Sequence, residues 1–351
     1  MKVLKATLDT ARRPLADFAA RRNLWLYARA EFLDFLTRAV GGRADVLLAE
    51  ANGAIVGMLP FLSLECPGMG RIVNSLPWYG SHGGCTIDTQ ADVGAVRTAL
   101  LNAFCAEIDA PDVVSSVMIL SHAEEEAAGT YRNALAPTAL DHRIGQVTKL
   151  PEADDDATLL ALYAQKTRNL VRKALKQGFS EEVRDDDAAW DALHHLHAEN
   201  MAAIGGKAKP RAHLEALRAT IPLAMRRLSL ATEGGAVAAA MLVLYGGRTA
   251  EYVTPAVRSD MRPRQPLSFL VHLGLQDAIR RGMTDWNWGG TWVGQTALHH
   301  FKAGFGAEDR PYSYLVKASP SGLAAMKSRR AELGALFPYF YTYPYAALDS
   351  A

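Results

Sequence analysis

Apolar and polar positions along this 351-residue chain follow two different periods. Residues 22–40 place apolar side chains every three to four positions, which predicts an amphipathic helix. The run 45–50 is apolar between Asp45 and Glu50, the run 54–62 is apolar throughout, and Asn52-Gly53 lies between the two. Because Asn-Gly favours the tight turn that joins two antiparallel strands, these runs predict a β-hairpin.

The same pattern continues through the rest of the chain and repeats once. Further predicted helices span 91–108, 122–135, 156–177, 187–203, 210–226 and 267–281, and further strands span 71–74, 113–120, 227–232, 236–245, 248–254, 284–288 and 313–316. Each half therefore has the order helix, hairpin strands, helix, strand, which predicts a duplicated domain. The acidic, proline-containing segment 150–156 has the composition of an interdomain linker. We expect an α/β (α+β) fold with domains at 1–150 and 151–319, and a ligand site in the crevice between them.

Composition excludes several classes of protein. The net charge of +1 gives no sign of a polyanion partner for the molecule as a whole. The N-terminal segment has no apolar signal core, and no run reaches the roughly 18 apolar residues of a membrane span. We therefore expect a cytoplasmic protein without stable membrane insertion. Cys66, Cys85 and Cys105 lack paired spacing, which indicates free thiols rather than disulfides or a zinc site.

Two neighbouring segments near the C-terminus have the composition of a ligand site. Asp285-Trp-Asn-Trp-Gly-Gly-Thr291 predicts a strand that stops at its glycine pair, and His300-Phe-Lys-Ala-Gly-Phe-Gly306 predicts a short helix with a glycine exit. Glycines beside a strand end let a ligand approach the backbone closely. Lys302 on the short helix is then placed to reach that ligand, with Phe301 and Phe305 anchoring the helix.

These segments, together with Lys166-Thr-Arg-Asn-Leu-Val-Arg-Lys-Ala-Leu-Lys-Gln-Gly178, resemble the Fem family of aminoacyltransferases, in which two GNAT-like domains stand in tandem. The resemblance rests on motifs in the second half and on architecture in the first. It implies transfer of an activated acyl group onto an amine, with aminoacyl-tRNA as donor and a cell-envelope precursor as acceptor. It also implies that the segment after residue 320 packs back on the first domain. The long coiled-coil arm of some members and their N-terminal phosphate-binding lysine have no counterpart here.

The resemblance and the chemistry of the residues together give a set of candidate site residues. Lys302 maps to the lysine associated with the reacting carbonyl, where a cation stabilises an oxyanion. Asp285 is a candidate base, or orients the amine. The resemblance associates Arg168 or Arg172 with acceptor phosphates, and an arginine fork suits that role. The full set of candidate substrate-binding residues is Arg168, Arg172, Trp78, Tyr79, His82, Asn287, Gly289, Gly290, Trp292 and His300.

Basic residues in two predicted loops are candidates for holding a phosphate-rich donor. The donor candidates are Lys207, Lys209, Arg258, Arg262, Arg264 and Gln265. A coenzyme A enzyme would carry a glycine-rich turn before the helix at 267–281, where this chain has two prolines without N–H groups. We therefore place acyl-coenzyme A second to aminoacyl-tRNA as the donor, and a degenerate pair that only binds an anion third.

No resident cofactor or metal is expected. The run His194-His195-Leu-His197 has no carboxylate that completes a ligand set. The expected partners are a small-molecule or peptide amine acceptor and tRNA. The pattern leaves open the identity of the acyl group, the acceptor and the oligomeric state.

Overall fold

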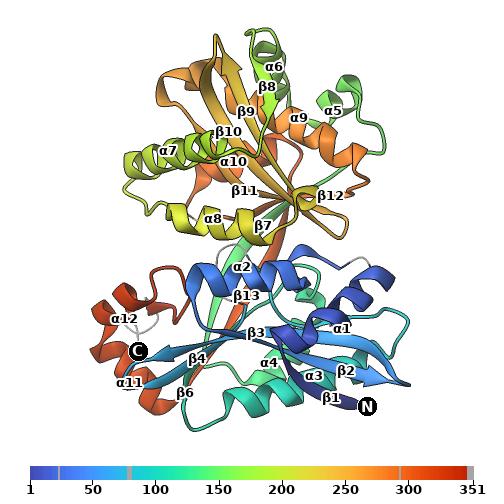
Figure 1. Cartoon of the computed structure of the whole chain (residues 1–351), viewed down its shortest axis with the longest axis vertical. Helices are drawn as coiled ribbons and strands as arrows, with labels where there is room; N and C mark the ends of the chain where they lie inside the picture. The colour runs from blue at the N-terminus through green and yellow to red at the C-terminus, as the bar shows by residue number, and fades with distance from the viewer. Residues whose placement is uncertain (23, 77–80, 292–293, 346–351) are drawn as a thin grey trace. The chain divides into compact units, whose positions relative to one another are not determined.

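The computed structural model describes residues 1–22, 24–76, 81–291 and 294–345. The chain forms two compact units, the first made of Met1–Arg143 with Pro311–Ala351 and the second of Ile144–Arg310 (Figure 1). The boundaries fall inside two long strands, β7 (Ala139–Lys149) and β13 (Glu308–Ala318), rather than in the polar segment 150–156. Each strand thus contributes its two ends to different units.

The first unit has the following further elements in chain order. They are β1 (Lys2–Thr7), α1 (Leu8–Arg21), η1 (Leu26–Ala28), α2 (Ala30–Val40), β2 (Arg43–Ala51), β3 (Ala54–Cys66), β4 (Gly70–Ser75), β5 (Thr86–Ile87), α3 (Val93–Ile108), β6 (Val113–Ile119), η2 (Glu125–Ala127), α4 (Ala128–Leu135), α11 (Pro320–Ser328) and α12 (Arg330–Leu336). The sheet order is β1-β2-β3-β4-β6-β13, with β5 beside β3. All of these pairs are antiparallel except β4–β6, which is parallel.

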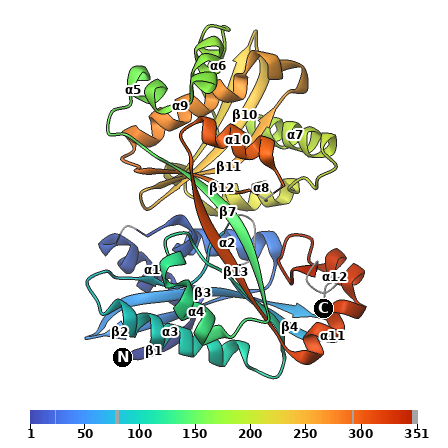
Figure 2. The same ribbon diagram turned by 180° about the vertical axis from the view of Figure 1, so that it is seen from behind.

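Both faces of the first unit's sheet are covered. Leu47 and Ala49 of β2 belong to the core cluster that α3 completes, and the alternate residues Val46 and Leu48 are equally buried. Figures 1 and 2 show α3 and α4 on one face and α1 and α2 on the other. Burial on both faces explains why β2 and β3 have almost continuous apolar runs rather than alternating ones.

The second unit contains the other elements of the chain. They are α5 (Asp156–Leu162), α6 (Gln165–Leu175), β8 (Ser180–Val183), α7 (Asp187–Ala203), α8 (Arg211–Thr220), η3 (Leu223–Met225), β9 (Arg226–Glu233), β10 (Ala236–Gly246), β11 (Thr249–Val257), η4 (Ser259–Arg264), α9 (Pro266–Arg280), β12 (Asp285–Thr291) and α10 (Thr296–Gly304). The sheet order is β7-β12-β11-β10-β9-β8. Only β11–β12 is parallel, and α9 is the crossover between these two strands.

The predicted fold class is confirmed: each unit is a mixed, mainly antiparallel sheet flanked by helices. In the second unit, α7 and α9 lie on opposite faces of the sheet (Figure 2). The core beneath α9 is dense, because Gly274 leaves room for the side chains of Met241 and Trp286. Among the described residues, no helix is both long enough and apolar enough to cross a membrane.

Several elements were absent from the predictions. The strands β1, β5, β7 and β8 and the helices α11 and α12 were missed, and so was α1, whose pattern is interrupted by Pro14. The predicted helix 22–40 begins only at Ala30. The predicted helix 156–177 is two helices, because Tyr163 and Ala164 have extended backbone between α5 and α6. Burial of the Tyr163 ring against Phe305 explains the break.

The C-terminal segment packs on the first unit. The Asn74 side-chain amide donates to the carbonyl oxygen of Tyr341 at 2.6 Å. Ser115 Oγ donates to the carbonyl oxygen of Thr342 at 2.8 Å. These contacts tie residues 341 and 342 to β4 and β6.

Candidate functional site

The second unit contains a point at which two strands separate. β11 and β12 pair in parallel only from Thr249↔Asp285 to Glu251↔Asn287. Beyond that pair β12 remains with β7, whereas β11 continues along β10 to Val257. We call this point the strand fork and define it by Glu251 and Asn287. The prediction that β12 stops at its glycine pair was wrong, since pairing with β7 carries the strand through Gly290 to Thr291.

Hydrogen bonds at the strand fork orient the backbone of β12. Asn287 is 2% exposed, and its Nδ2 donates to Glu251 Oε2 at 2.8 Å. Its Oδ1 accepts from the backbone N–H of Gly289 at 2.9 Å. Gly289 has a φ of 73°, a conformation that glycine adopts without strain. The buried pair of side chains thus fixes the direction in which the Gly289 peptide points.

Lys302 of α10 lies against this backbone. Its side chain is almost fully buried, and Nζ donates to Thr291 Oγ1 at 2.8 Å and to the carbonyl oxygens of Gly289 and Gly290 at 3.3 and 3.4 Å. All three acceptors are neutral, so burial lowers the pKa of Lys302 from 10.5 to about 8. The two longer bonds are the ones that a ligand oxygen replaces at least cost.

Aromatic packing holds α10 in place. The Phe301 and Phe305 rings are 5.3 Å apart, and both contact the Trp288 ring at 6.0 and 5.4 Å, which confirms the predicted anchoring of this helix. Position 304 requires glycine because Thr167 of α6 packs against it. A Cβ added at Gly304 would lie 2.2 Å from Thr167 Oγ1. The glycines and phenylalanines around Lys302 therefore place its amine.

The pKa of Lys302 predicts an opposite pH dependence for activity and for stability. If the ammonium form acts on the reacting carbonyl, the transfer rate will fall as the pH rises through about 8. Burial of the ammonium lowers the stability of the folded protein by a constant amount below pH 8, where Lys302 is protonated in both the folded and the unfolded state. Between pH 8 and 10.5 the folded protein loses this proton and the cost disappears. The free energy of unfolding therefore rises with pH over that window. A pH–rate profile paired with denaturant unfolding at each pH measures both. A rate that rises through pH 8 would instead indicate that the neutral amine acts as a base.

Asp285 does not lie beside the lysine amine. It begins β12, forms a salt bridge with Lys149 of β7, and accepts from Thr284 Oγ1 at 2.8 Å. Gly289 is four positions further along the strand, a span of about 13 Å. Asp285 is thus an ion-pair partner at the far end of the strand, and the candidate role as base has no geometric support.

The predicted arginines lie on α6. Arg168 Nη2 donates to the carbonyl oxygen of Tyr163 at 3.0 Å, and its Nε is buried without a hydrogen-bond partner. Arg172 is exposed, and no other residue in the described part of the chain pairs with it. Arg172 is therefore available to an anion, whereas Arg168 is partly engaged in holding the α5–α6 corner.

The remaining substrate candidates have different surroundings. His300 is exposed on α10, one residue after His299, whose Nε2 lies 2.8 Å from Asp309 Oδ1. His82 lies in the first unit and stacks on Trp25 at 5.0 Å between ring centroids. Trp78, Tyr79 and Trp292 lie outside the described residues.

His82 is a core side chain rather than an open ligand contact. Burial lowers its pKa to about 3, so its ring is neutral at ordinary pH. Its Nδ1 lies 3.0 Å from the carbonyl oxygen of Leu120, which this nitrogen satisfies as a donor. The adjoining cavity measures about 30 Å³, space for a water molecule rather than for a substrate.

The donor candidates in the η4–α9 region are largely engaged by protein groups. Arg264 pairs with Glu233 and donates from Nε to Gln177 Oε1 at 2.9 Å. Arg258 pairs with Asp260 at 2.8 Å. Gln265 is the N-cap of α9, with a φ of 66°. Arg262 and Lys207 are both exposed. For a phosphate-rich donor, this region therefore provides Arg262 near the N-terminus of α9 rather than a continuous row of available basic side chains.

Beyond the strand fork, side chains of the α7–α8 region close the free edge of β11. Lys209 Nζ donates to the carbonyl oxygen of Val253 at 3.0 Å, and burial lowers the pKa of this lysine to about 8. The Asn200 side chain donates to the carbonyl oxygen of Val257 at 2.7 Å and accepts from its N–H at 3.0 Å. Pro255 between them has no N–H to offer. An extended ligand cannot pair with this edge unless it displaces Lys209 or Asn200.

Three contributors to the site were missed from the sequence. Glu251 is the one acidic residue of β11. A single charge in an otherwise uncharged strand was the feature of the sequence that could have marked it as a site residue. Thr291 Oγ1 donates to Gln146 Oε1 at 3.0 Å, and Gln146 lies on the unpredicted strand β7. Nothing local distinguishes Thr291 or Gln146 from other strand residues.

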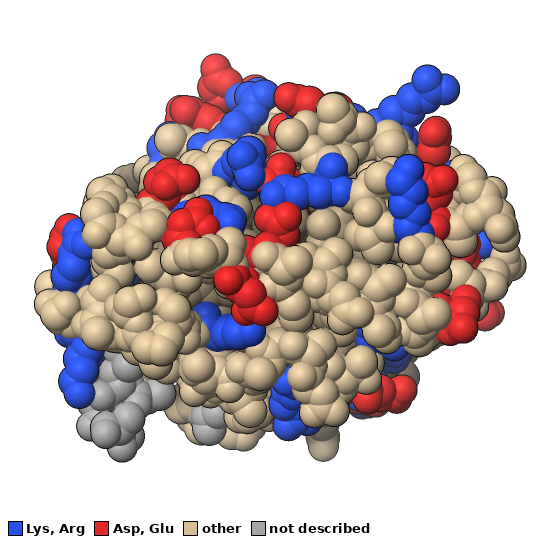
Figure 3. Space-filling view, turned by 90° about the horizontal axis from the view of Figure 1, so that it is seen from below, with Lys and Arg blue, Asp and Glu red and all other residues tan. Residues whose placement is uncertain are grey.

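The distribution of charged side chains and of metal-ligating side chains also bears on the chemistry of the chain. On the face drawn in Figure 3, basic and acidic side chains are interspersed rather than gathered by sign. Within residues 1–22, 24–76, 81–291 and 294–345, no cluster of three or more His, Cys, Asp or Glu side chains has an arrangement suited to a metal ion. His197, one of the three clustered histidines, instead accepts from the Lys209 N–H at 3.1 Å.

The second unit thus combines the strand fork, the crossover helix α9 and the buried Lys302. Residues 161–303, most of the second unit, match the family model described as the acetyltransferase (GNAT) domain. No curated protein sequence matches the chain.

Several solved structures are similar to this chain over nearly its whole length. FemX matches with a TM-score of 0.71 at 14% identity, over 90% of this chain and 97% of its own. A tandem GNAT protein from the clavulanic acid biosynthesis pathway matches with a TM-score of 0.53 at 12% identity, over 90% and 98%. The C-terminal domain of a putative lysylphosphatidylglycerol synthetase from Agrobacterium fabrum matches with a TM-score of 0.54 at 13% identity, over 93% and 96%. The chain thus has the Fem-like fold of two GNAT domains in tandem.

Proposed function

We propose that this protein is an amide-forming aminoacyltransferase, which moves an aminoacyl group from aminoacyl-tRNA onto the amine of a small-molecule, peptide or cell-envelope precursor. The observation that carries the proposal is Lys302, a buried ammonium held against the Gly289 and Gly290 carbonyls at the strand fork. A preorganised cation without an acidic partner suits a site where negative charge develops during the reaction. The proposed location is the cytoplasm, where charged tRNA is present.

The reaction has a simple atom balance. The acceptor amine attacks the ester carbonyl of the donor, a C–N bond forms, and the carbonyl oxygen becomes an oxyanion. Lys302 Nζ exchanges a weak bond to Gly289 or Gly290 for one to this oxyanion. As the intermediate collapses, the C–O bond to the tRNA ribose breaks, and the proton lost by the amine passes to the leaving oxygen. Asp285 lies about 13 Å away along β12 and is out of reach, so in this scheme the proton passes directly between the substrates.

The closed edge of β11 supports an ester donor over coenzyme A. The pantetheine arm of coenzyme A is an extended chain with amide groups, of the kind that adds to an exposed strand edge. Here Lys209 and Asn200 occupy that edge at Val253 and Val257. Pro263 and Pro266 also remove two N–H groups where a pyrophosphate would be held. These residues do not fit coenzyme A.

The N-terminus of α9 supports a phosphate contact for the donor. No side chain caps this end of the 15-residue helix, and Arg262 is exposed just before it. Helix N-termini favour anions, and arginine adds a fork of donors. The chemistry suits a phosphate near the reacting end of tRNA, and the exposed Arg172 on α6 suits an anionic group of the acceptor.

The test compares the two donor classes on the same preparation. Purified protein is incubated with a mixture of charged tRNAs, and separately with a panel of acyl-coenzyme A thioesters, and both binding and slow donor hydrolysis are followed. We expect a response to charged tRNA alone, weakened by Arg262→Gln but not by the matched change Arg38→Gln on α2 of the first unit. A response to acyl-coenzyme A alone would overturn the tRNA assignment and leave an acyl-coenzyme A N-acyltransferase.

A further inference from the structure

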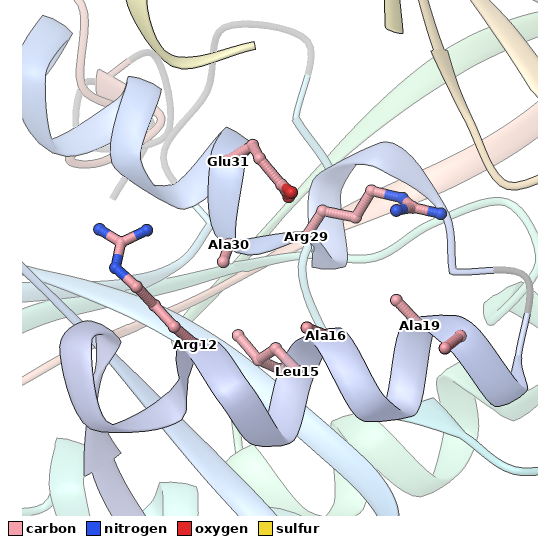
Figure 4. Close-up of a pocket in the computed structure, with 8 residues that line it drawn as sticks. Arg12, Leu15, Ala16, Ala19, Arg29, Ala30 and Glu31 are labelled. Carbon is pink, nitrogen blue, oxygen red and sulfur yellow. The ribbon is translucent and has the colours of Figure 1, made fainter. Parts of the chain in front are cut away.

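The first unit contains a groove that plays no part in the acyl-transfer site of the second unit. It has a volume of about 480 Å³ and lies between α1 and the start of α2 (Figure 4). That volume is within the range of small-molecule sites. The lining residues are Arg12, Leu15, Ala16, Ala19, Ala20, Arg29, Ala30 and Glu31.

One wall of the groove is apolar and flat. Leu15, Ala16, Ala19 and Ala20 are successive groove-facing positions of α1, and three of the four are alanine. Figure 4 shows Ala16 and Ala19 directed from α1 toward the residues at the start of α2. Because alanine extends only one carbon from the helix, this face leaves room for an apolar group of a ligand.

Two charged groups on the opposite wall are available to a ligand. Arg29 Nε donates to the carbonyl oxygen of Leu24 at 3.1 Å, which fixes the plane of the guanidinium. Neither of its two Nη atoms, nor the carboxylate of Glu31, has a hydrogen-bond or ion-pair partner in the part of the chain that the structure describes. Both side chains are half-buried, and they do not pair with each other.

The third charged residue of the groove is already neutralised. Arg12 Nη2 donates to both carboxylate oxygens of Asp34 at 2.7 Å. The remaining open charges are therefore one cation at Arg29 and one anion at Glu31. A guanidinium with two open NH2 groups suits a carboxylate, and a carboxylate suits an ammonium. The apolar wall opposite them suits an aliphatic side chain.

We propose that this groove binds a short peptide with free termini, whose carboxylate pairs with Arg29, whose ammonium pairs with Glu31, and whose apolar side chains pack on the alanines of α1. The site needs no contribution from Lys302. Its failure in a binding test would therefore leave the proposed acyl transfer untouched.

The probe is leucyl-alanine, compared with its N-acetylated and its C-amidated forms. Binding to the full-length protein is measured by titration calorimetry, and by shifts of methyl resonances of the alanines in the groove. We expect saturable binding of the free dipeptide, and at least about tenfold weaker binding of either blocked form, because each loses one charge-assisted contact.

Variants separate the site from general effects on folding. Arg29→Gln and Glu31→Gln should each weaken binding by at least about tenfold. Ala16→Leu, at an exposed position of α1, should block the groove without disturbing the core. Arg13→Gln and Asp17→Asn change exposed charges on α1 that do not line the groove, and should leave binding unchanged.

Several results would overturn the proposal. They are absence of saturable binding at millimolar dipeptide, equal binding of the blocked forms, or unchanged affinity in both Arg29→Gln and Ala16→Leu. Ala16→Leu keeps the test decisive if either charge variant proves unstable, because it adds a side chain to a solvent-facing position.

Discussion

Lys302→Met is expected to lower the rate of acyl transfer by about 10²- to 10³-fold, the usual effect of removing one donor to a developing oxyanion. The same variant is expected to unfold with a higher free energy than the wild type at pH 7. The difference between the ordinary pKa of 10.5 and about 8 corresponds to about 3 kcal/mol of buried-charge cost. Loss of the three hydrogen bonds of Nζ offsets part of this gain, so we expect a net increase of about 1–2 kcal/mol.

The measurement pairs single-turnover transfer with urea unfolding at pH 7 and at pH 10.5. The stability gain should shrink at pH 10.5, where the wild-type amine has lost its proton. Lys327→Met, at an exposed position of α11, is the matched control and should change neither rate nor stability. If Lys302→Met transfers at the wild-type rate, the lysine has a packing role and the proposed function loses its main support.

Asn287→Ala is expected to lower the free energy of unfolding by about 2–4 kcal/mol. The side chain is buried, donates to Glu251 Oε2 and accepts from the Gly289 N–H. Its removal takes a donor from the buried Glu251 carboxylate and an acceptor from the half-buried Gly289 amide, and leaves a small cavity. Because the Gly289 peptide is then free to turn, the carbonyl that holds Lys302 loses its direction, and transfer should fall as well.

The matched control for this variant is Asn133→Ala, at an exposed position of α4. Its effect on stability should remain within about 0.5 kcal/mol. A further readout distinguishes positioning from simple loss of stability. The pH at which transfer declines should move upward in Asn287→Ala, as the Lys302 amine gains access to water. A variant that is destabilised but keeps the wild-type pH profile and rate would show that Asn287 supports the fold alone.

The hairpins and the crossover helix followed from local pattern. Asn52-Gly53 has positive φ at both residues, as the turn signal required, and α9 ends one residue before the predicted Arg281. The missed strand β7 is half-buried and mixes polar with apolar residues, so no period marks it. Its place in the sheet depends on partners far away in sequence, which a local pattern does not contain.

The site, like the fold, was predicted where it depends on neighbouring residues and missed where it depends on distant ones. Phe301, Lys302 and Phe305 were recognised because their spacing fixes a short anchored helix, and the structure places the lysine at the glycine pair as the motif suggested. Asp285 was given a role because it is close in sequence to Gly289. A strand extends about 3.3 Å per residue, so residues that are close in sequence are well separated along β12. Asp285 therefore lies far from Gly289 and pairs with Lys149 instead.

The sequence by itself determined the repeated order of elements, the turn residues and the lysine on its phenylalanine-anchored helix, because these depend on periodicity and on residues within a few positions of each other. The tertiary structure decided that β12 runs past its glycines, that Glu251 and Asn287 meet at the strand fork, and that Lys209 and Asn200 close the edge of β11. It also decided the pKa of Lys302, because burial among neutral oxygens, not residue type, sets the cost of that charge.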